Sequence, residues 1–443
     1  MFHDFENYFK DSTDFFDQYQ WLFKYPITKI LIENCLNEFP DDWLNVLQKL
    51  STEELNKFAN GELINKNWPP SLLSFVNKCK TLNKLPSLQI KSDCQLPKTF
   101  KLGLSEKKQH EIYYLAELIN DKCLKHNIRT IVDFGSGLGY IGQLLNYLYG
   151  YEVIGLESSL DNIKIAKKRQ NLLYPDSVNK VKFFHIKVTN NDYTEMKSTI
   201  KNLTNDEEFC LIGLHACADL SVNAIKLFSI IPTVKLLIMV SCCYHKLEET
   251  DNETLINFPV SKKLKFIITE NNNDDDDKYK EILRRPFLRL ACQEPAKRWD
   301  NMSKDLHDKH AFYVLSRAVI ELFTHKNNIK LTKCVKKATR ISQCKNFETY
   351  LQDTLERYYF NENKMSNDEE FKNNIKNLWK LNESKLSIVE IYTGLQLLLQ
   401  APAESLVLYD RYYWLIEKNY SPEIIAVLSN IISPRCYATV AVK

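Results

Sequence analysis

The spacing of apolar residues changes along the chain and divides it into segments of different predicted structure. Over residues 1–98, aromatic side chains recur at helical intervals, as in Phe5, Tyr8 and Phe9, and Ser51 begins a Ser-Thr-Glu-Glu run ahead of further apolar positions. That run is a capping-box arrangement, which is typical of the first turn of a helix. Residues 1–98 are therefore predicted to form an α-helical N-terminal region.

Residues 99–248 combine short apolar strands with amphipathic helices. Strands are predicted at residues 130–132, 152–156, 181–188, 209–214 and 235–240. Continuous apolar strands that alternate with helices indicate a parallel sheet covered on both faces. The predicted fold class is α/β, with a Rossmann-like core over residues 99–248.

Beyond residue 248 the spacing is mostly helical to about residue 418, and residues 424–442 form an apolar hairpin pattern. Within the helical part, residues 270–278 are almost entirely Asn and Asp, which predicts a solvated loop. Membrane spans need about 18 or more apolar residues, and the apolar runs of this chain are much shorter. Since no secretory signal is visible either, a cytoplasmic or nuclear location is expected.

Glycine is scarce in this chain, and most of it lies in one place. The 443 residues contain 10 glycines, whereas a usual frequency of about 7% would give roughly 31. Six of the ten fall between Gly135 and Gly155. A glycine-rich turn between a strand and a helix lets the backbone approach a bound cofactor where a Cβ atom would collide. This cluster is therefore the first candidate for a binding site.

The spacing of these glycines indicates the type of cofactor. Dinucleotide-binding folds use Gly-x-Gly-x-x-Gly because pyrophosphate lies on the helix N-terminus. Here Gly135, Gly137 and Gly139 form Gly-x-Gly-x-Gly, with Asp133 before them and Glu157 at the end of the next strand. This pattern predicts S-adenosylmethionine (SAM): Asp133 can set the turn, and Glu157 can accept both ribose hydroxyls. The alternatives are a nicotinamide or flavin cofactor, or a turn without a ligand.

Cysteine and histidine residues follow two of the predicted strands, and three interpretations of these side chains remain open. Zinc ligands are one, since His215, Cys217, Cys242, Cys243 and His245 have suitable types; no Cys-x-x-Cys pair occurs, so no metal site is predicted. Direct catalysis is the second, with His215 or His245 as base and Cys242 or Cys243 as transient nucleophile. Packing of the pocket wall is the third.

Several motifs together resemble the methyltransferase-like protein 25 family, including its rRNA-adenine-dimethylase-domain-containing relatives. The matching segments are residues 104–111, 132–139, 213–220, 240–245, 290–293 and 433–435. The resemblance implies a class I SAM methyltransferase fold, in which residues 249–395 are a helical insertion and residues 396–443 supply the closing helix and hairpin. The Asn/Asp-Pro-Pro-Tyr/Phe motif of amino-methylating enzymes is absent, so the resemblance leaves the methylated atom open.

The net charge of +3 is small, but it is unevenly distributed. Residues 281–345 carry 15 Lys and Arg against 6 Asp and Glu, interleaved with Trp299, Phe312 and Tyr313. Positive charge with nearby aromatic rings suits RNA, and the alternative is a solvated helical face. The predicted function is SAM-dependent methylation of a macromolecule, RNA before protein. The alternative is a non-catalytic SAM-fold scaffolding protein.

Overall fold

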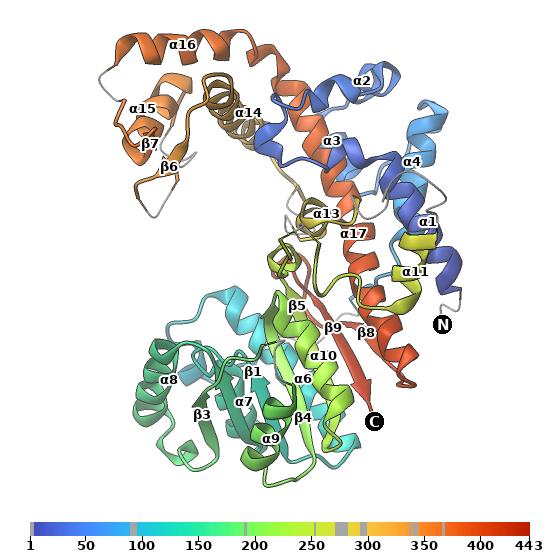
Figure 1. Ribbon diagram of the computed structural model, residues 1–443, viewed down its shortest axis with the longest axis vertical. Helices are drawn as coiled ribbons and strands as arrows, with labels where there is room; N and C mark the ends of the chain where they lie inside the picture. Colours follow the sequence, from blue (N-terminus) through green and yellow to red (C-terminus); the bar gives the residue numbers. More distant parts are fainter. Residues whose placement is uncertain are drawn as a thin grey trace. The chain divides into compact units, whose positions relative to one another are not determined.

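The computed structural model describes residues 4–88, 95–189, 193–251, 254–270, 282–292, 299–335, 338–339, 344–365 and 368–443 (Figure 1). The loop predicted at residues 270–278 lies outside these ranges, apart from Glu270 at the end of a helix.

A seven-stranded sheet forms the centre of the fold, with the strand order β3-β2-β1-β4-β5-β9-β8. Strands β1 to β5 are parallel, β9 runs antiparallel to β5, and β8 runs antiparallel to β9. The strands are β1 (Thr130–Phe134), β2 (Glu152–Glu157), β3 (Val181–His185), β4 (Phe209–Cys217), β5 (Val234–Cys242), β8 (Glu423–Ala426) and β9 (Tyr437–Val442). This order, closed by an antiparallel hairpin, confirms the predicted Rossmann-like methyltransferase fold.

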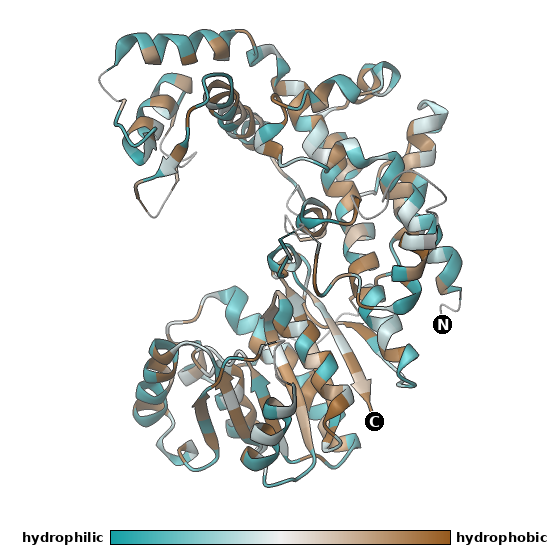
Figure 2. Cartoon of the chain, viewed as in Figure 1, coloured by the Kyte–Doolittle hydropathy of each residue, from teal (hydrophilic) through white to brown (hydrophobic). Residues whose placement is uncertain are grey.

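Helices cover both faces of the sheet. Because alternate residues of each strand point to opposite faces, a strand can pack against helices on both sides. Ile131 belongs to a buried cluster with residues of α6, α7 and α8, whereas Val132 belongs to one with residues of α9 and α10. These helices are α6 (Glu106–Lys125), α7 (Tyr140–Tyr149), α8 (Leu160–Leu173), α9 (Tyr193–Leu203) and α10 (Asp219–Ile230). The strands are predominantly hydrophobic (Figure 2), and each fully buried aliphatic side chain contributes roughly 1.5–3 kcal/mol.

Four strands, β1, β2, β4 and β5, extend beyond their predicted ends, and β3 is shorter. β4 continues through residues 215–217, and β5 ends at Cys242, so the cysteine-bearing segments belong to the sheet itself. β3 ends at His185 instead of residue 188. The extension of β4 had no signal in the sequence, because His-Ala-Cys is not a strand-forming run.

The rest of the described chain is mainly helical, as predicted. The capping box at Ser51 is present, since its hydroxyl accepts from the Glu54 amide and the Glu54 carboxylate accepts from the Ser51 amide. The N-terminal helices are α1 (Phe5–Gln18), α2 (Asp41–Leu47), α3 (Thr52–Ala59), α4 (Pro70–Leu82) and α5 (Lys98–Lys101). The later elements are α11 (Lys262–Glu270), α13 (Arg285–Leu290), α14 (Lys304–Lys326), α15 (Phe347–Arg357), α16 (Glu369–Lys380), α17 (Leu386–Glu417) and the small hairpin β6 (Leu331–Lys333) with β7 (Tyr358–Phe360).

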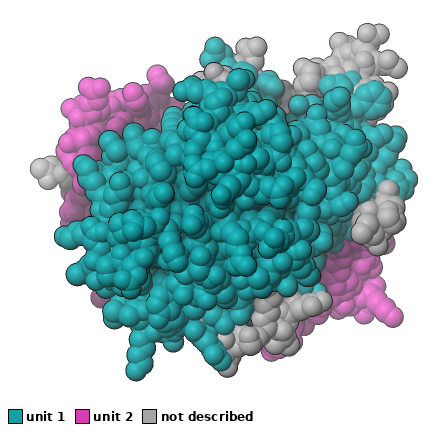
Figure 3. All heavy atoms as spheres, turned by 90° about the horizontal axis from the view of Figure 1, so that it is seen from below, with its two compact units in different colours: residues 1–15, 82–297, 400–443 teal, residues 16–81, 298–399 magenta. Residues whose placement is uncertain are grey.

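The chain separates into two compact units, which Figure 3 distinguishes by colour. Unit 1 contains residues 1–15, 82–297 and 400–443, and it holds the sheet; unit 2 contains residues 16–81 and 298–399. The contacts within unit 1 thus group residues 249–297 with the sheet. The predicted domain boundaries after residues 98, 248 and 395 stay a prediction. None of the described helices is both long and apolar enough to cross a membrane.

Candidate active site

The loop after β1 has a left-handed backbone at each of its three glycines. The φ angle is +71° at Gly135, +57° at Gly137 and +74° at Gly139, a region that strains residues with a Cβ atom. A Cβ atom added at Gly139 would also lie 2.5 Å from the ring of Phe183. A Cβ atom added at Gly137 would have a backbone oxygen 3.9 Å away as its nearest neighbour. Gly139 is therefore required by packing, and Gly137 leaves open space beside the loop backbone.

Glu157, at the end of β2, holds this loop in place. Its Oε2 atom accepts a hydrogen bond from the Gly137 amide at 2.8 Å, and its Oε1 atom accepts one from the Ser159 amide at 2.9 Å. The side chain is buried. Oε1 also accepts a longer hydrogen bond of 3.4 Å from Nδ2 of Asn162. The contact of Glu157 with ribose hydroxyls stays a prediction, and Oε2 is the oxygen with a second lone pair that could make it.

Asp133, on β1, presents an unpartnered carboxylate oxygen. The residue is only 1% exposed, and its Oδ2 atom has no hydrogen-bond partner among the described residues. Burial raises the pKa of Asp133 to about 7. The positive charge of Lys108 lowers this pKa, and the negative charge of Glu157 raises it by a smaller amount. Leaving a buried acceptor unpaired costs about 1–3 kcal/mol. Such a group at a pocket indicates a ligand that donates hydrogen bonds or carries positive charge.

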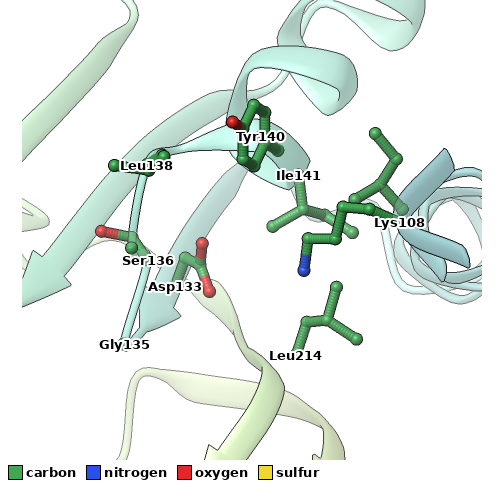
Figure 4. Close-up of a pocket in the computed structure, with 10 residues that line it drawn as sticks. Lys108, Asp133, Gly135, Ser136, Leu138, Tyr140, Ile141 and Leu214 are labelled. Atoms are coloured by element: carbon green, nitrogen blue, oxygen red, sulfur yellow. The ribbon is translucent and has the colours of Figure 1, made fainter. Parts of the chain in front are cut away.

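A pocket lies over the glycine loop, next to Asp133 (Figure 4). Lys108 reaches toward it from α6, opposite Asp133 and Ser136. The lining residues are Lys108, Ile112, Asp133, Gly135, Ser136, Gly137, Leu138, Tyr140, Ile141 and Leu214. The pocket thus combines an ammonium group, a carboxylate and exposed loop backbone with an apolar wall. Lys108 was missed as a site residue, although it lies in the first segment that carries the family resemblance.

His215, near the end of β4, is held by a buried carboxylate. Its Nε2 atom lies 2.9 Å from Oε1 of Glu111 on α6, and the Ser433 hydroxyl donates to the same oxygen at 2.8 Å. Burial raises the pKa of Glu111, but the hydrogen bonds from His215 and Ser433 and the charges of His215 and Lys108 outweigh burial and lower it. Glu111 therefore fixes the His215 ring with Nε2–H toward the carboxylate, which leaves Nδ1 as the ring atom that can accept a proton.

Three cysteines converge beside His215, at the carboxyl ends of β4 and β5. The Sγ atoms of Cys217, Cys242 and Cys243 all lie within 4.8 Å of one another, and those of Cys217 and Cys242 are 2.7 Å apart. The hydrogen bond from Cys242 is the largest influence on Cys217 and lowers the pKa of its thiol. Burial and the same contact raise the pKa of Cys242. Within this pair the shift directions favour the proton on Cys242.

The fourth predicted acceptor-side residue, His245, is engaged in a different contact. Its Nδ1 atom lies 3.1 Å from Sγ of Cys292, and its backbone carbonyl accepts a hydrogen bond from Arg285. Burial and the charges of Arg289, Lys246 and Arg285 lower the pKa of His245. The structure thus brings His215, Cys242 and Cys243 close to Cys217, and it places His245 against α13.

The motifs behind the family resemblance meet in a buried network at the same edge of the sheet. The Tyr244 hydroxyl donates to Oε1 of Glu404 at 3.0 Å, and Nη1 of Arg435 lies 2.8 Å from the same oxygen. Arg435 also donates to the backbone carbonyl of Ala291. Residues far apart in the sequence therefore support one structural feature, the turn that follows β5.

The basic segment does not form a uniform surface. Trp299 is only 2% exposed and packs against His307 and His310, while Phe312 packs against Tyr350 and Trp379. Trp299 is therefore part of a packed interior, whereas Phe312 and Tyr313 are half-buried. Stacking of RNA bases on these rings stays a prediction. Five of the basic residues lie outside the described residues: Lys297, Arg298, Lys336, Lys337 and Arg340.

Residues 107–250 match the family model described as a methyltransferase domain. The chain is 22% identical to the human protein named probable methyltransferase-like protein 25, over 77% of this chain and 75% of the human protein. The mouse protein of the same name is 28% identical, over 56% of this chain and 39% of the mouse protein.

Solved methyltransferases give only weak structural likenesses. Coclaurine N-methyltransferase bound to N-methylheliamine and SAH is 9% identical, with a TM-score of 0.27 over 85% of this chain and 95% of that one. A plantazolicin methyltransferase in complex with SAH is 13% identical, with a TM-score of 0.22 over 68% of this chain and 88% of that one. At these low scores the likenesses carry no weight of their own, and the fold class rests on strand order and register.

The family resemblance predicted from the sequence motifs is confirmed by the curated relatives and by the matching family model. Both the glycine loop and the ends of β4 and β5 lie inside the matched range. Residues 107–250 are therefore a methyltransferase domain, and the chain is similar to the proteins named probable methyltransferase-like protein 25.

Proposed function

We propose that this chain binds SAM at the glycine loop and methylates a macromolecular acceptor, RNA before protein. The single observation that carries the proposal is the unpartnered, buried Oδ2 atom of Asp133 beside the pocket. Within a methyltransferase domain, a carboxylate at this position fits a ligand with an ammonium group.

The residues at the pocket fit each end of SAM. Asp133 would hold the ammonium group and Lys108 the carboxylate of its amino-acid end, because each offers the opposite charge. Gly137 would let the ligand approach the loop backbone, and Glu157 would hold the ribose. When bound, SAM supplies a methyl group on a positively charged sulfur, which a nucleophile can attack directly.

On the acceptor side, the protein has to align the attacking atom with the methyl group of SAM. Where the attacking atom carries a proton, a base has to remove it. Among the predicted catalytic residues, His215 is the best placed base, because Glu111 fixes its ring and leaves Nδ1 available. Cys242 is disfavoured as a free nucleophile, since burial and Cys217 raise the pKa of its thiol. Cys243 and His245 remain candidates for contacts with the acceptor.

RNA is favoured as acceptor because of the charge of residues 281–345. The exposed basic residues among the described part of this segment are Arg289, Lys304, Lys309, Arg317, Lys326, Lys330, Lys333 and Lys345. Arg285 is not free to bind phosphate, because it bonds Glu249 and two backbone carbonyls. The proposal therefore rests on phosphate contacts rather than on base stacking.

The test is tritiated methyl transfer from SAM into RNA and protein fractions of cells that lack this protein. The full chain should label RNA, and Asp133→Asn should not. Label confined to protein would overturn the preference for RNA. Label in neither fraction, with SAM binding intact, would favour the alternative of a non-catalytic scaffolding protein.

A further inference from the structure

The three cysteines at the ends of β4 and β5 form a cluster that methyl transfer does not require. Among the described residues, Cys217, Cys242 and Cys243 are the only group of three or more His, Cys, Asp or Glu side chains with ligand atoms close enough to hold one metal ion. Their Sγ atoms lie within 4.8 Å of one another. Three thiolates around tetrahedral zinc, with Zn–S bonds of about 2.3 Å, would lie about 3.8 Å apart. Zinc binding therefore requires the Sγ atoms of Cys217 and Cys242 to separate from their distance of 2.7 Å.

The backbone around the cluster adopts conformations that side chains rarely accept. His215, Ala218 and Cys243 have φ angles of +59°, +50° and +44°. Among the other described residues with positive φ that are not glycine, all but Glu362 are Asn or Asp, which tolerate this region. Histidine tolerates this region as well, so Ala218 and Cys243 are the two strained residues of other types at this place, next to the thiols. Such strain persists where the surroundings require a particular geometry, and it is concentrated at functional sites.

The surroundings can also neutralise the negative charge of three thiolates. The buried guanidinium of Arg411 has two nitrogens, Nε and Nη2, without a hydrogen-bond partner among the described residues, and Cys242 is among the groups that act on it electrostatically. Lys246 and His215 act in the same way on Cys217. A divalent cation with three thiolates carries one net negative charge, which this positive environment can offset.

From this geometry we propose that Cys217, Cys242 and Cys243 bind one zinc ion at the carboxyl ends of β4 and β5. Thiolates are soft ligands that select zinc over calcium or magnesium. Three protein ligands leave a fourth position for water or for an atom of an acceptor. The absence of a Cys-x-x-Cys pair argued against a metal, but adjacent parallel strands bring Cys217 opposite Cys242 without that spacing.

The experiment measures metal in the full chain, purified with a reductant and without chelators. We expect about one zinc per chain. After exchange with Co²⁺ alone, we expect the sulfur-to-cobalt charge-transfer band and the visible bands of tetrahedral cobalt. Cys217→Ser and Cys243→Ser should lower metal affinity at least about tenfold. Cys292→Ser is the matched control, since Cys292 is a nearby, partly buried thiol outside the cluster, and it should keep the metal.

Chain folding is checked separately by circular dichroism and by SAM binding, so that a misfolded variant is not mistaken for a lost ligand. Cys217 and Cys243 are both only partly buried, so neither substitution alters a fully buried side chain. Absence of zinc and of a cobalt spectrum in the folded protein would overturn the proposal. So would a Cys217–Cys242 disulfide, or three thiols that react freely in the folded chain. These readouts need no methyl acceptor, so they stand or fall independently of the proposed function.

Discussion

Nε2 of His215 lies 2.9 Å from Oε1 of Glu111, which places a buried carboxylate from α6 behind a histidine at the end of β4. Because the two residues belong to different elements, packing of α6 on the sheet sets the direction of the ring. Glu111 is thus a positioning residue for His215, and it does not itself line the pocket.

Glu111→Gln is expected to lower kcat for methyl transfer while leaving the affinity for SAM unchanged. General-base catalysis contributes about 10²–10⁴-fold, so His215→Ala should lose most of that factor and Glu111→Gln a part of it. Initial-rate kinetics and calorimetry separate the two effects. An equal loss of SAM affinity in Glu111→Gln would show a structural role instead.

Asp133→Asn is expected to abolish SAM binding and to stabilise the fold. The folded carboxyl has a pKa of about 7 against an ordinary value of 3.8, so the folded state binds more protons between these values and loses stability as pH rises through them. The neutral amide removes this penalty. Above pH 7 the Asp133→Asn variant should therefore melt at a higher temperature than the unmodified protein. A variant that melts lower and still binds SAM would contradict this assignment.

The same carboxyl predicts how SAM affinity depends on pH. Below about pH 7 the free protein carries a protonated Asp133, which cannot pair with an ammonium group. Affinity should therefore fall about fivefold between pH 7 and pH 6 and approach a tenfold loss per pH unit below that. Calorimetry at several pH values checks this, and a flat profile would exclude Asp133 as the partner of the ammonium group.

Glu157→Gln is expected to loosen the glycine loop. Both carboxylate oxygens accept backbone amides, from Gly137 and Ser159, and an amide group can offer only one acceptor atom. SAM affinity should fall, and hydrogen exchange at the Gly137 amide should accelerate. Unchanged exchange would mean that Glu157 does not hold the loop.

Unit 2 contains a buried carboxylate between two histidines, which predicts acid sensitivity. Glu390 lies 2.5 Å from Nδ1 of His307 and 2.7 Å from Nδ1 of His310. Burial raises the pKa of Glu390, but the hydrogen bonds from both histidines outweigh burial and lower it. The stabilisation is therefore present above the ordinary pKa of 4.5 and is lost as pH falls through the lowered value.

Glu390→Gln should destabilise the chain at pH 7 by about 1–3 kcal/mol, the usual cost of leaving a buried hydrogen-bonding group without its partner. The difference from the unmodified protein should shrink below pH 4.5. Thermal unfolding as a function of pH measures both effects. A difference that stays constant with pH would show that the Glu390 charge does not contribute.

The parts of the fold that could be predicted were those with local signals. β1 and β2 are apolar runs, and the Ser51 capping box has a fixed spacing, so both were found. Glu111 was missed as a functional residue because its partner His215 is about a hundred positions away, and only the packing of α6 joins them. The positive φ angle of Cys243 has no sequence signal, since cysteine does not favour that conformation.

The central claim is that the glycine loop binds SAM, and one pair of variants tests it. Gly137 and Gly150 both have positive φ angles, and neither position leaves an added Cβ atom closer than 3.9 Å to a neighbour. Only Gly137 lines the pocket. Calorimetry with SAM should show binding to the unmodified chain and to Gly150→Arg, and none to Gly137→Arg. No binding to the unmodified chain, or equal binding to both variants, would contradict the account.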